Sequence, residues 1–399
     1  MSDTHPGALF MSSAAARSRP TAGARVSRSP GRSRRMFTAA GFGFAAILPL
    51  FVSAGGTTLE TMVVAAAYVI MALGLNIVVG FAGLLDLGYV AFFAIGAHVA
   101  AYFGSAFWID AGGGSGIALF VGEPTASMPG IHFNFLVILV LAIVATTIAG
   151  VLIGVPTLRL RGDYIAIVTL AFGEIIGQVV NNGREIELFG GTLTGGASGI
   201  TGIDRIDLPL FDRFDVLDLR PWYWFALTLV GLTLLVNSRL RGSRVGRAWI
   251  ALREDEEAAA SAGVPIVRAK LLAYGVGAAF GGVSGAFLAS YISAVNPSQF
   301  TFSFSILILA MVVLGGMGST WGVVVGAIVL SVINSYLLPT VLAGVPGSVG
   351  LDFDMSEISS GIYGFLLVIL MLLRPQGLLP ERRAALGLEA PRAPGRLDG

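Results

Sequence analysis

Long apolar segments recur along this chain, and they constrain its fold more than any other feature of the sequence. Only 12% of the residues are charged, whereas a soluble protein carries about 25%. A helix needs about 17 or more apolar residues to span a bilayer, and the shortest segment here must borrow flanking residues or be broken. The pattern predicts an all-α polytopic membrane protein with about ten transmembrane helices, some of them short or broken at Gly-rich junctions. The predicted spans are Phe37–Ala54, Leu59–Val79, Asp86–Gly104, Phe135–Val155, Tyr164–Val180, Trp222–Val236, Leu271–Tyr291, Phe304–Leu314, Gly322–Leu338 and Ile358–Leu373.

Arginine and lysine are distributed unevenly over the loops between these segments. Cytoplasmic loops of membrane proteins carry an excess of these residues. We therefore expect the basic loops to be cytoplasmic, and these are Thr157–Asp163, Arg239–Lys270 and Arg374–Gly399. The loops without Lys or Arg are expected outside, and these are Ser105–Asn134, Ile292–Ser303 and Pro339–Glu357. The loop Asn181–Pro221 has arginines, but it is long and its acids outnumber them, so we expect it in the periplasm as a small irregular cap.

Both ends of the chain lack the apolar pattern. Residues 1–35 are rich in Ser, Arg, Pro and Gly and are predicted to form a disordered basic cytoplasmic tail. Residues 378–399 are predicted to form a second cytoplasmic tail, which leaves residues 36–377 for the transmembrane domain. The pair Arg34-Arg35 before an apolar run resembles a twin-arginine signal, with Val52-Ser53-Ala54 as a cleavage site. We favour the alternative, in which the basic residues anchor a first spanning helix.

Several classes of active site are excluded by the residues present. The chain has no cysteine, so it forms neither disulfides nor Cys-ligated metal sites. Its three histidines, His5, His98 and His132, are scattered and show no metal-binding spacing. The Gly-rich run Thr194–Ile203 lacks the Lys-Ser/Thr and the preceding strand of a P-loop, and no Walker motif occurs elsewhere. We therefore expect no catalytic residue, no metal site and no cofactor on this chain.

Two Gly-rich stretches, Gly80–Gly88 and Gly315–Gly322, interrupt apolar segments without forming a hydrophilic loop. Such breaks are tolerated at membrane depth only inside protein or beside a water-filled cavity, and paired breaks often mark a binding site. The alternative is close packing of helices through small residues, and both can hold at once. The residues that we assign to a translocation pathway are Asn76, Gly80, Gly83, Asp86, Glu174, Gly315, Gly316 and Gly318.

Glu174 is the most informative of these residues. It lies eleven residues after Asp163, about 16 Å along a helix and inside the hydrocarbon layer. A carboxylate there is costly unless it faces a cavity or a partner. Glu174 therefore either lines the pathway or forms a hydrogen bond or ion pair that locks two helices. Asn76 and His98 are more typical of contacts between helices, and Asp86 of a helix N-cap.

The longest charged island of the sequence is Arg239–Lys270. The stretch Val245–Ala262 lacks Pro and has a single Gly, which predicts one helix. Ser243 can cap its start, and Gly263 can end it. Val245, Trp249 and Leu252 recur on one face of this helix, where we expect them to be exposed to a partner.

Five stretches of the chain resemble the inner-membrane permease subunits of branched-chain amino acid ABC importers. They are Gly74–Tyr89, Thr157–Tyr164, Thr169–Glu174, Arg247–Glu256 and Val313–Ser319, so the resemblance covers nearly all of the chain except its tails. It implies a location in the bacterial inner membrane. It also implies a second permease subunit, two cytoplasmic ATPase subunits that bind ATP and Mg, and a periplasmic binding protein.

The resemblance further implies that the charged island couples the permease to its ATPases. Residues 257–263 are similar to the E-A-A-x-x-x-G element of ABC permeases, although Ala273 and Gly275 stand where an apolar–Pro part would follow. A solvated charged loop is the alternative. The coupling residues are expected to be Val245, Trp249, Leu252, Glu254, Asp255, Glu257, Ala258, Ala259 and Gly263.

These features together predict a subunit that moves an amino acid with an apolar side chain through the membrane. Such a ligand requires dipoles or polar groups for its zwitterionic backbone and an apolar wall for its side chain. Permeases for urea or short amides are similar and remain an alternative. A rival of a different class is an ion-coupled secondary amino acid transporter with Glu174 as its ion site, but the long coupling stretch argues against it. We expect the lipid membrane to be a partner and nucleic acid not to be one.

Overall fold

The computed structural model describes residues 41–109, 116–121, 129–158, 160, 162–188, 191–207, 214–215, 217–341, 359–373 and 377–379. The chain divides into two compact units, Met1–Ala45 and Ala46–Gly399, and the described part of the first, residues 41–45, is helical. The predicted N-terminal tail and its twin-arginine stretch lie outside the described residues, as does the C-terminal tail beyond residue 379.

Helices dominate the described part of the second unit, because only helices and closed barrels satisfy all backbone polar groups in lipid. Seven of the described helical stretches are long and apolar enough to cross a membrane, and their bounds are Thr57–Phe81, Phe135–Thr157, Tyr164–Glu185, Arg220–Gly242, Ile266–Ile292, Pro297–Gly315 and Thr320–Pro339. Shorter apolar helices at Gly41–Leu50, Val90–Phe103 and Ser359–Leu373 correspond to the other predicted spans. The predicted all-α polytopic class is confirmed.

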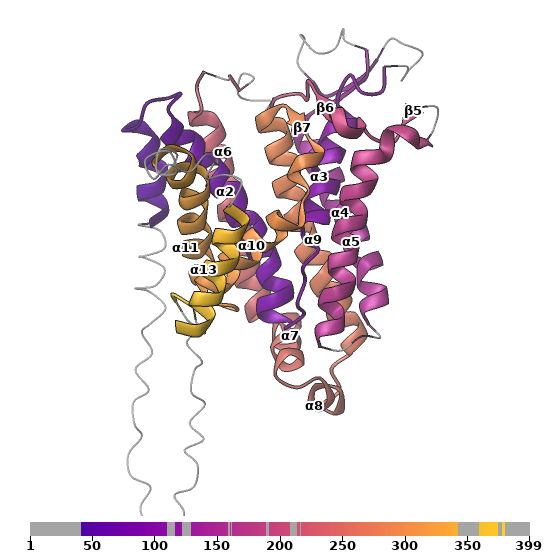
Figure 1. The fold of residues 1–399 in the computed structure, drawn as a ribbon, viewed down its shortest axis with the longest axis vertical. Coiled ribbons are helices and arrows are strands. Elements are labelled where there is room, and N and C mark those ends of the chain that lie inside the picture. Colours follow the sequence, from indigo (N-terminus) through magenta and orange to yellow (C-terminus); the bar gives the residue numbers. More distant parts are fainter. Residues whose placement is uncertain are drawn as a thin grey trace, which may run out of the picture. The chain divides into compact units, whose positions relative to one another are not determined.

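Figure 1 shows how these helices are arranged, with the chain coloured from indigo to yellow. The helices are α2 (Thr57–Leu75), α3 (Val90–Phe103), α4 (Phe135–Thr157), α5 (Asp163–Asn182), α6 (Arg220–Gly242), α7 (Arg244–Glu254), α8 (Glu256–Ser261), α9 (Ile266–Ile292), α10 (Phe302–Gly315), α11 (Thr320–Val332) and α13 (Ser359–Leu373). Two π-helical stretches, η2 (Asn76–Phe81) and η6 (Ile333–Val341), continue α2 and α11.

The long helix α9 lies at the centre of the packing and contacts α2, α3 and α4. Glycines allow its backbone to touch α3: a Cβ atom on Gly96 would overlap the backbone of Gly282, and one on Gly285 would overlap the backbone of Phe93. Close approach through small residues is the usual way in which membrane helices associate. The helices α3 and α9 are therefore in direct backbone contact along this part of their length.

A second group of helices is formed by α10 and α11, which pack against each other and against α2. Their crossing is also close, because a Cβ atom on Gly315 would overlap the backbone of Gly322. The helix α10 is short, but the preceding turn η5 (Pro297–Gln299) extends the apolar stretch to Pro297–Gly315. The predicted span Phe304–Leu314 thus borrows flanking residues, as expected.

One end of the helical body carries short strands, and the opposite end carries α7 and α8 (Figure 1). We call these the strand end and the α7–α8 end. The strands are β1 (Gly104–Ser105), β2 (Ile117–Leu119), β3 (Ile131–Phe133), β4 (Glu187–Leu188), β5 (Gly191–Thr192), β6 (Ile200–Thr201) and β7 (Ala294–Val295). The strand β1 pairs antiparallel with β3, β2 pairs parallel with β3, β4 pairs with β5, and β6 pairs with β7.

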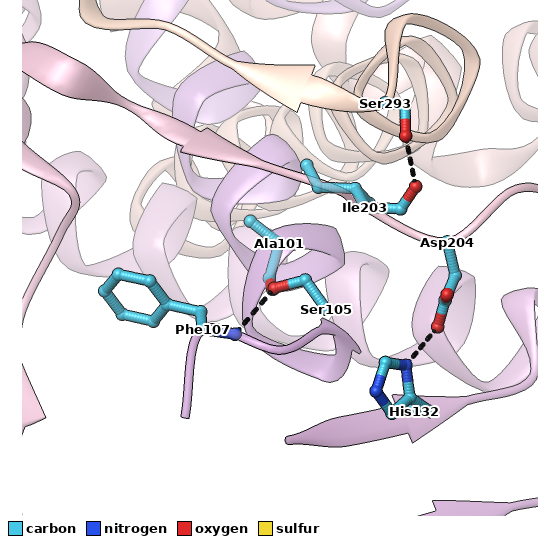
Figure 2. A network of polar contacts seen from close by, with 7 residues as sticks. All are labelled: Ala101, Ser105, Phe107, His132, Ile203, Asp204 and Ser293. Carbon is cyan, nitrogen blue, oxygen red and sulfur yellow. Dashed lines mark hydrogen bonds and ion pairs between the residues drawn. The ribbon is translucent and has the colours of Figure 1, made fainter. Parts of the chain in front are cut away.

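Side-chain bonds fix the strand end to the helices, as Figure 2 shows. His132 Nδ1 on β3 lies 2.6 Å from the Asp204 carboxylate, and both side chains are largely buried. The Ser293 hydroxyl, at the end of α9, donates to the Ile203 carbonyl at 2.5 Å. The β6–β7 pairing joins the same two regions. The loop predicted as an irregular cap is therefore tied to the end of α9 at the positions that are described.

Candidate functional site

The stretch Val245–Ala262 of the charged island lies in two helices, α7 and α8, so the predicted single helix is wrong. The break lies at Asp255, which has extended backbone angles (φ −159°, ψ 115°). Its Oδ1 accepts hydrogen bonds from the backbone N–H groups of Glu257 and Ala258, both at 2.9 Å. An Asp at the N-cap and acids in the first turn favour a new helix start. This stabilisation accounts for the break.

Trp249 and Leu252 are buried in the chain itself, so the prediction that they are exposed to a partner is wrong. Trp249 is 0% exposed and Leu252 is 5% exposed, and both belong to an apolar cluster with Ile77, Phe81 and residues of α9. The Trp249 indole N–H donates to the Ala269 carbonyl at 2.8 Å. The helix α7 is therefore folded back against the membrane domain, and its apolar face serves internal packing.

A different set of α7 and α8 residues is exposed. Of the predicted coupling residues, Val245 is half-buried and Ala259 is buried, whereas the exposed ones are Glu254, Asp255, Glu257, Ala258 and Gly263. Ile250, which is not among the predicted coupling residues, adds an apolar side chain that is 36% exposed. It follows Trp249 directly in the chain, and a residue next to an inward-facing one on a helix points about 100° away. The position of Ile250 directly after Trp249 could therefore have identified it as a candidate surface residue.

The short helix α8 is held in place at both ends. Gly263, with φ +85°, ends it as predicted, and the Val264 N–H donates to the Ala259 carbonyl at 3.0 Å. The Lys270 ammonium, which is 1% exposed, donates to the Glu256 carboxylate at 2.8 Å. Breaking such a pair would leave a buried charge without compensation. This ion pair thus fixes α8 against the start of α9.

The helix α7 contacts the first helix break directly. The Arg253 guanidinium donates through Nη1 to the Gly80 carbonyl in η2 at 2.5 Å. Gly83 has φ +71°, and a Cβ atom there would lie 2.9 Å from Arg253 Cγ. Charge-assisted hydrogen bonds are among the stronger ones. This hydrogen bond therefore links α7 to the backbone of the break.

The two Gly-rich breaks, which are far apart in the sequence, contact each other. The Asn76 side-chain oxygen accepts a hydrogen bond from the Gly318 N–H at 2.8 Å, and Asn76 is fully buried. Gly80 lies so close to both that a Cβ atom there would overlap Asn76 and Gly318. Gly316 and Gly318 have φ +109° and +83°, which L side chains rarely adopt. The breaks thus form one buried junction.

Asp86 lies in the same region but is not a helix cap. The helix α3 begins at Val90, so the predicted start of this span at Asp86 is wrong. Asp86 is 2% exposed; its Oδ1 accepts from the Gly88 N–H at 2.9 Å, and its Oδ2 has no hydrogen-bond partner among the described residues. Asp and Asn side chains commonly stabilise turns in this way. The buried carboxylate therefore organises the extended segment between η2 and α3.

Glu174 is separate from this junction. It lies on the exposed face of α5, together with Ile167, Ala171 and Gln178. Their spacing places the four side chains on one stripe of the helix. The Glu174 side chain is therefore exposed on the surface of the described part of the chain and is not buried in the junction.

The described residues contain no group of three or more His, Asp or Glu residues that could hold a metal ion. Hydrogen bonds between backbone, amide and guanidinium groups hold the junction together in this part of the chain. Such an arrangement can transmit a displacement from α7 to the breaks.

Comparison with known proteins assigns the chain to a family. Residues 57–371 match the model of the permease component of the branched-chain amino acid transport system. The chain belongs to this permease family. The match covers every described helix from α2 to α11 and most of α13, so the family assignment rests on the membrane domain and not on the tails.

Relatives with printed names agree with this assignment. The chain is 37% identical to the high-affinity branched-chain amino acid transport system permease protein LivM of Salmonella typhimurium and to that of Escherichia coli, over 91% of this chain and 79% of each relative. It is 27% identical to the probable LivM protein of Methanocaldococcus jannaschii, over 61% of this chain and 69% of that relative. No solved structure matches. Membership of the permease family indicates a transporter rather than an enzyme.

Proposed function

We propose that this chain is the transmembrane permease subunit of an ATP-binding cassette importer, which moves branched-chain amino acids across the bacterial inner membrane. The family match and the identity to the LivM proteins support this substrate class. A second permease, two ATPase subunits that bind ATP and Mg, and a periplasmic binding protein complete the importer. The weaker similarity to LivH, another permease protein of a branched-chain amino acid transport system, supports the second permease.

One observation carries the coupling part of the proposal: the Arg253–Gly80 hydrogen bond joins an exposed surface to a buried helix break. We assign the ATPase contact to the exposed residues Ile250, Glu254, Glu257 and Ala258. Trp249 then has a positioning role, because its burial fixes α7 on the membrane domain. A push on α7 would reach the junction of the two breaks through Arg253.

The sidedness follows from the same assignment. The α7–α8 end contacts the ATPases and is cytoplasmic, whereas the strand end faces the periplasm and the binding protein. The excess of basic residues in the island 239–270 supports this orientation.

The exposed stripe of α5 is assigned to the contact with the second permease. An ionised carboxylate facing lipid is costly, so Glu174 needs a partner there. Small and polar residues such as Ala171 and Gln178 are typical of helix–helix interfaces in membranes. In this position Glu174 also borders any pathway that runs between the two permeases.

The test is leucine uptake by the complete importer reconstituted in liposomes. Uptake is expected to require ATP, the ATPase subunits and the binding protein, and to continue after proton and sodium gradients are dissipated. Uptake that proceeds without the ATPases and stops when the gradients are dissipated would instead assign the chain to ion-coupled transport. Uptake of urea or acetamide in place of leucine would assign the chain to the amide permeases.

A further inference from the structure

A cavity of about 300 Å³ lies among helices from both halves of the chain. Its lining comes from α2, α3, α9, the turn η5, α10 and η6. The turn η5 follows β7 and therefore lies at the strand end, whereas Tyr68 lies about 16 Å along α2 from its first residue. The cavity thus extends from the strand end into the membrane-spanning region. Its volume is at the lower limit of the range for small-molecule sites, which is about 300–1,000 Å³.

One wall of the cavity is apolar and already ordered. The ring of Phe304 packs against Tyr68 with centroids 5.5 Å apart and against Phe93 with centroids 5.1 Å apart. Leu288 and Ile292 of α9 extend this wall. Contacts between rings from three helices hold the aromatic side chains in defined positions. The wall therefore offers a fixed apolar surface to a ligand.

Neutral polar side chains form another part of the cavity lining. Ser298, Gln299, Thr301 and Ser303 line the cavity on the side of η5 and the start of α10. No Lys, Arg, Asp, Glu or His is among the described residues that line it. A net charge that is removed from water needs a compensating charge, which this lining does not provide. The cavity therefore suits a solute without net charge.

The lining on the side of α11 comes from a π-helical stretch. Asn334 is the second residue of η6 and is one of the residues that line the cavity. π-Helical turns are rare and occur frequently at functional sites. Here η6 continues α11 beside the cavity.

We propose that this cavity receives the amino acid at the strand end and holds it as a zwitterion. The hydroxyl and amide groups bind its ammonium and carboxylate, and Tyr68, Phe93 and Phe304 contact its side chain. The inference rests on the proposed function and deepens it, because it locates a substrate site within this chain. L-Leucine, L-isoleucine and L-valine have the required chemistry. L-Lysine and L-glutamate carry an extra charge, and urea has no apolar part for the aromatic wall.

This chain has no cysteine, so an introduced cysteine is its single thiol, and the test uses the complete importer. A Ser303→Cys variant is treated with a small polar thiol reagent from the strand side, with and without millimolar L-leucine. We expect leucine to slow the reaction at least threefold and equal concentrations of L-lysine, L-glutamate or urea to leave it unchanged. Thr201→Cys is the control, because Thr201 is exposed on β6 and does not line the cavity. An equal reaction rate with and without leucine at Ser303→Cys, or equal protection by urea, overturns the proposal.

A second test uses a substitution that fills the cavity with a larger side chain. Ser303→Phe is expected to lower leucine uptake at least tenfold, while Ile306→Phe, on the same helix and also half-buried but outside the lining, is expected to leave it within twofold of the unchanged chain. Ser303→Phe with normal uptake would refute the site. The function itself is tested separately: if the unchanged importer does not transport leucine, the proposed function fails, whereas normal transport with an unprotected Ser303→Cys refutes only the cavity assignment.

Discussion

Replacing Trp249 by Ala should release α7 from the membrane domain. Trp249 is 0% exposed and donates one hydrogen bond to α9. Truncation of a buried Trp to Ala costs about 3–5 kcal/mol, and each 1.4 kcal/mol is about a tenfold change in an equilibrium constant. The opening equilibrium of α7 should therefore shift by about a hundredfold or more towards the open state.

Hydrogen exchange of the purified protein in lipid nanodiscs measures this shift, because backbone amides report local opening. The amides of residues 244–254 should lose about two decades of protection in Trp249→Ala. Trp249→Phe keeps most of the buried area and loses the indole N–H, which is worth about 1 kcal/mol, so a loss of about fivefold is expected. Ile250→Ala is the control, since this neighbouring side chain is partly exposed and should leave exchange unchanged.

The same variants distinguish internal packing from contact with a partner. Ile250→Ala should weaken co-purification with the ATPase without changing exchange in α7, whereas Trp249→Ala should change both. If Trp249→Ala keeps normal protection and only the ATPase is lost, Trp249 contacts the partner and our assignment is refuted.

Three further outcomes are expected. Arg253→Ala removes a charge-assisted bond to Gly80 worth about 1.5–3 kcal/mol, so ATPases should still co-purify while leucine-stimulated ATP hydrolysis falls; full stimulation would exclude this bond as the coupling path. Glu174→Ala should lower leucine uptake more than it lowers membrane abundance, and normal uptake by Glu174→Gln would show that no charge is needed there. Glu257→Cys should react with an impermeant reagent only from the cytoplasmic side, and labelling from the periplasm would invert the topology.

Most of the membrane-spanning segments could be predicted from the sequence because they are apolar and bounded by charged or Gly-rich residues. The buried face of each helix could not. Lipid-facing and protein-facing side chains are both apolar in a membrane, so the hydrophobic pattern does not separate them. The exposure of Glu174 and the composition of the cavity therefore emerge only from the packing.

The contacts of α7, α8 and the junction also differ in how far the sequence predicts them. The break at Asp255 was readable in principle, since an Asp followed by acids and alanines is a helix start. The packing of α7 against its own membrane domain could not be predicted, because an amphipathic face does not reveal whether it packs internally or on a partner. The bond between Asn76 and Gly318 joins residues 242 positions apart, and no local pattern reports it.

The backbone contact between α3 and α9 has a mechanical consequence. With the backbones of Gly96 and Gly282 already touching, α3 and α9 cannot approach each other further, and we call this pair of helices the block. The cavity has Phe93, Leu288 and Ile292 on this block and Thr301, Ser303 and Asn334 on the other helices. Any shift of α10 and η6 past the block changes the shape of the cavity from one side only. A narrowing of the cavity is therefore expected to come from α10 and η6, and not from an approach of α3 to α9.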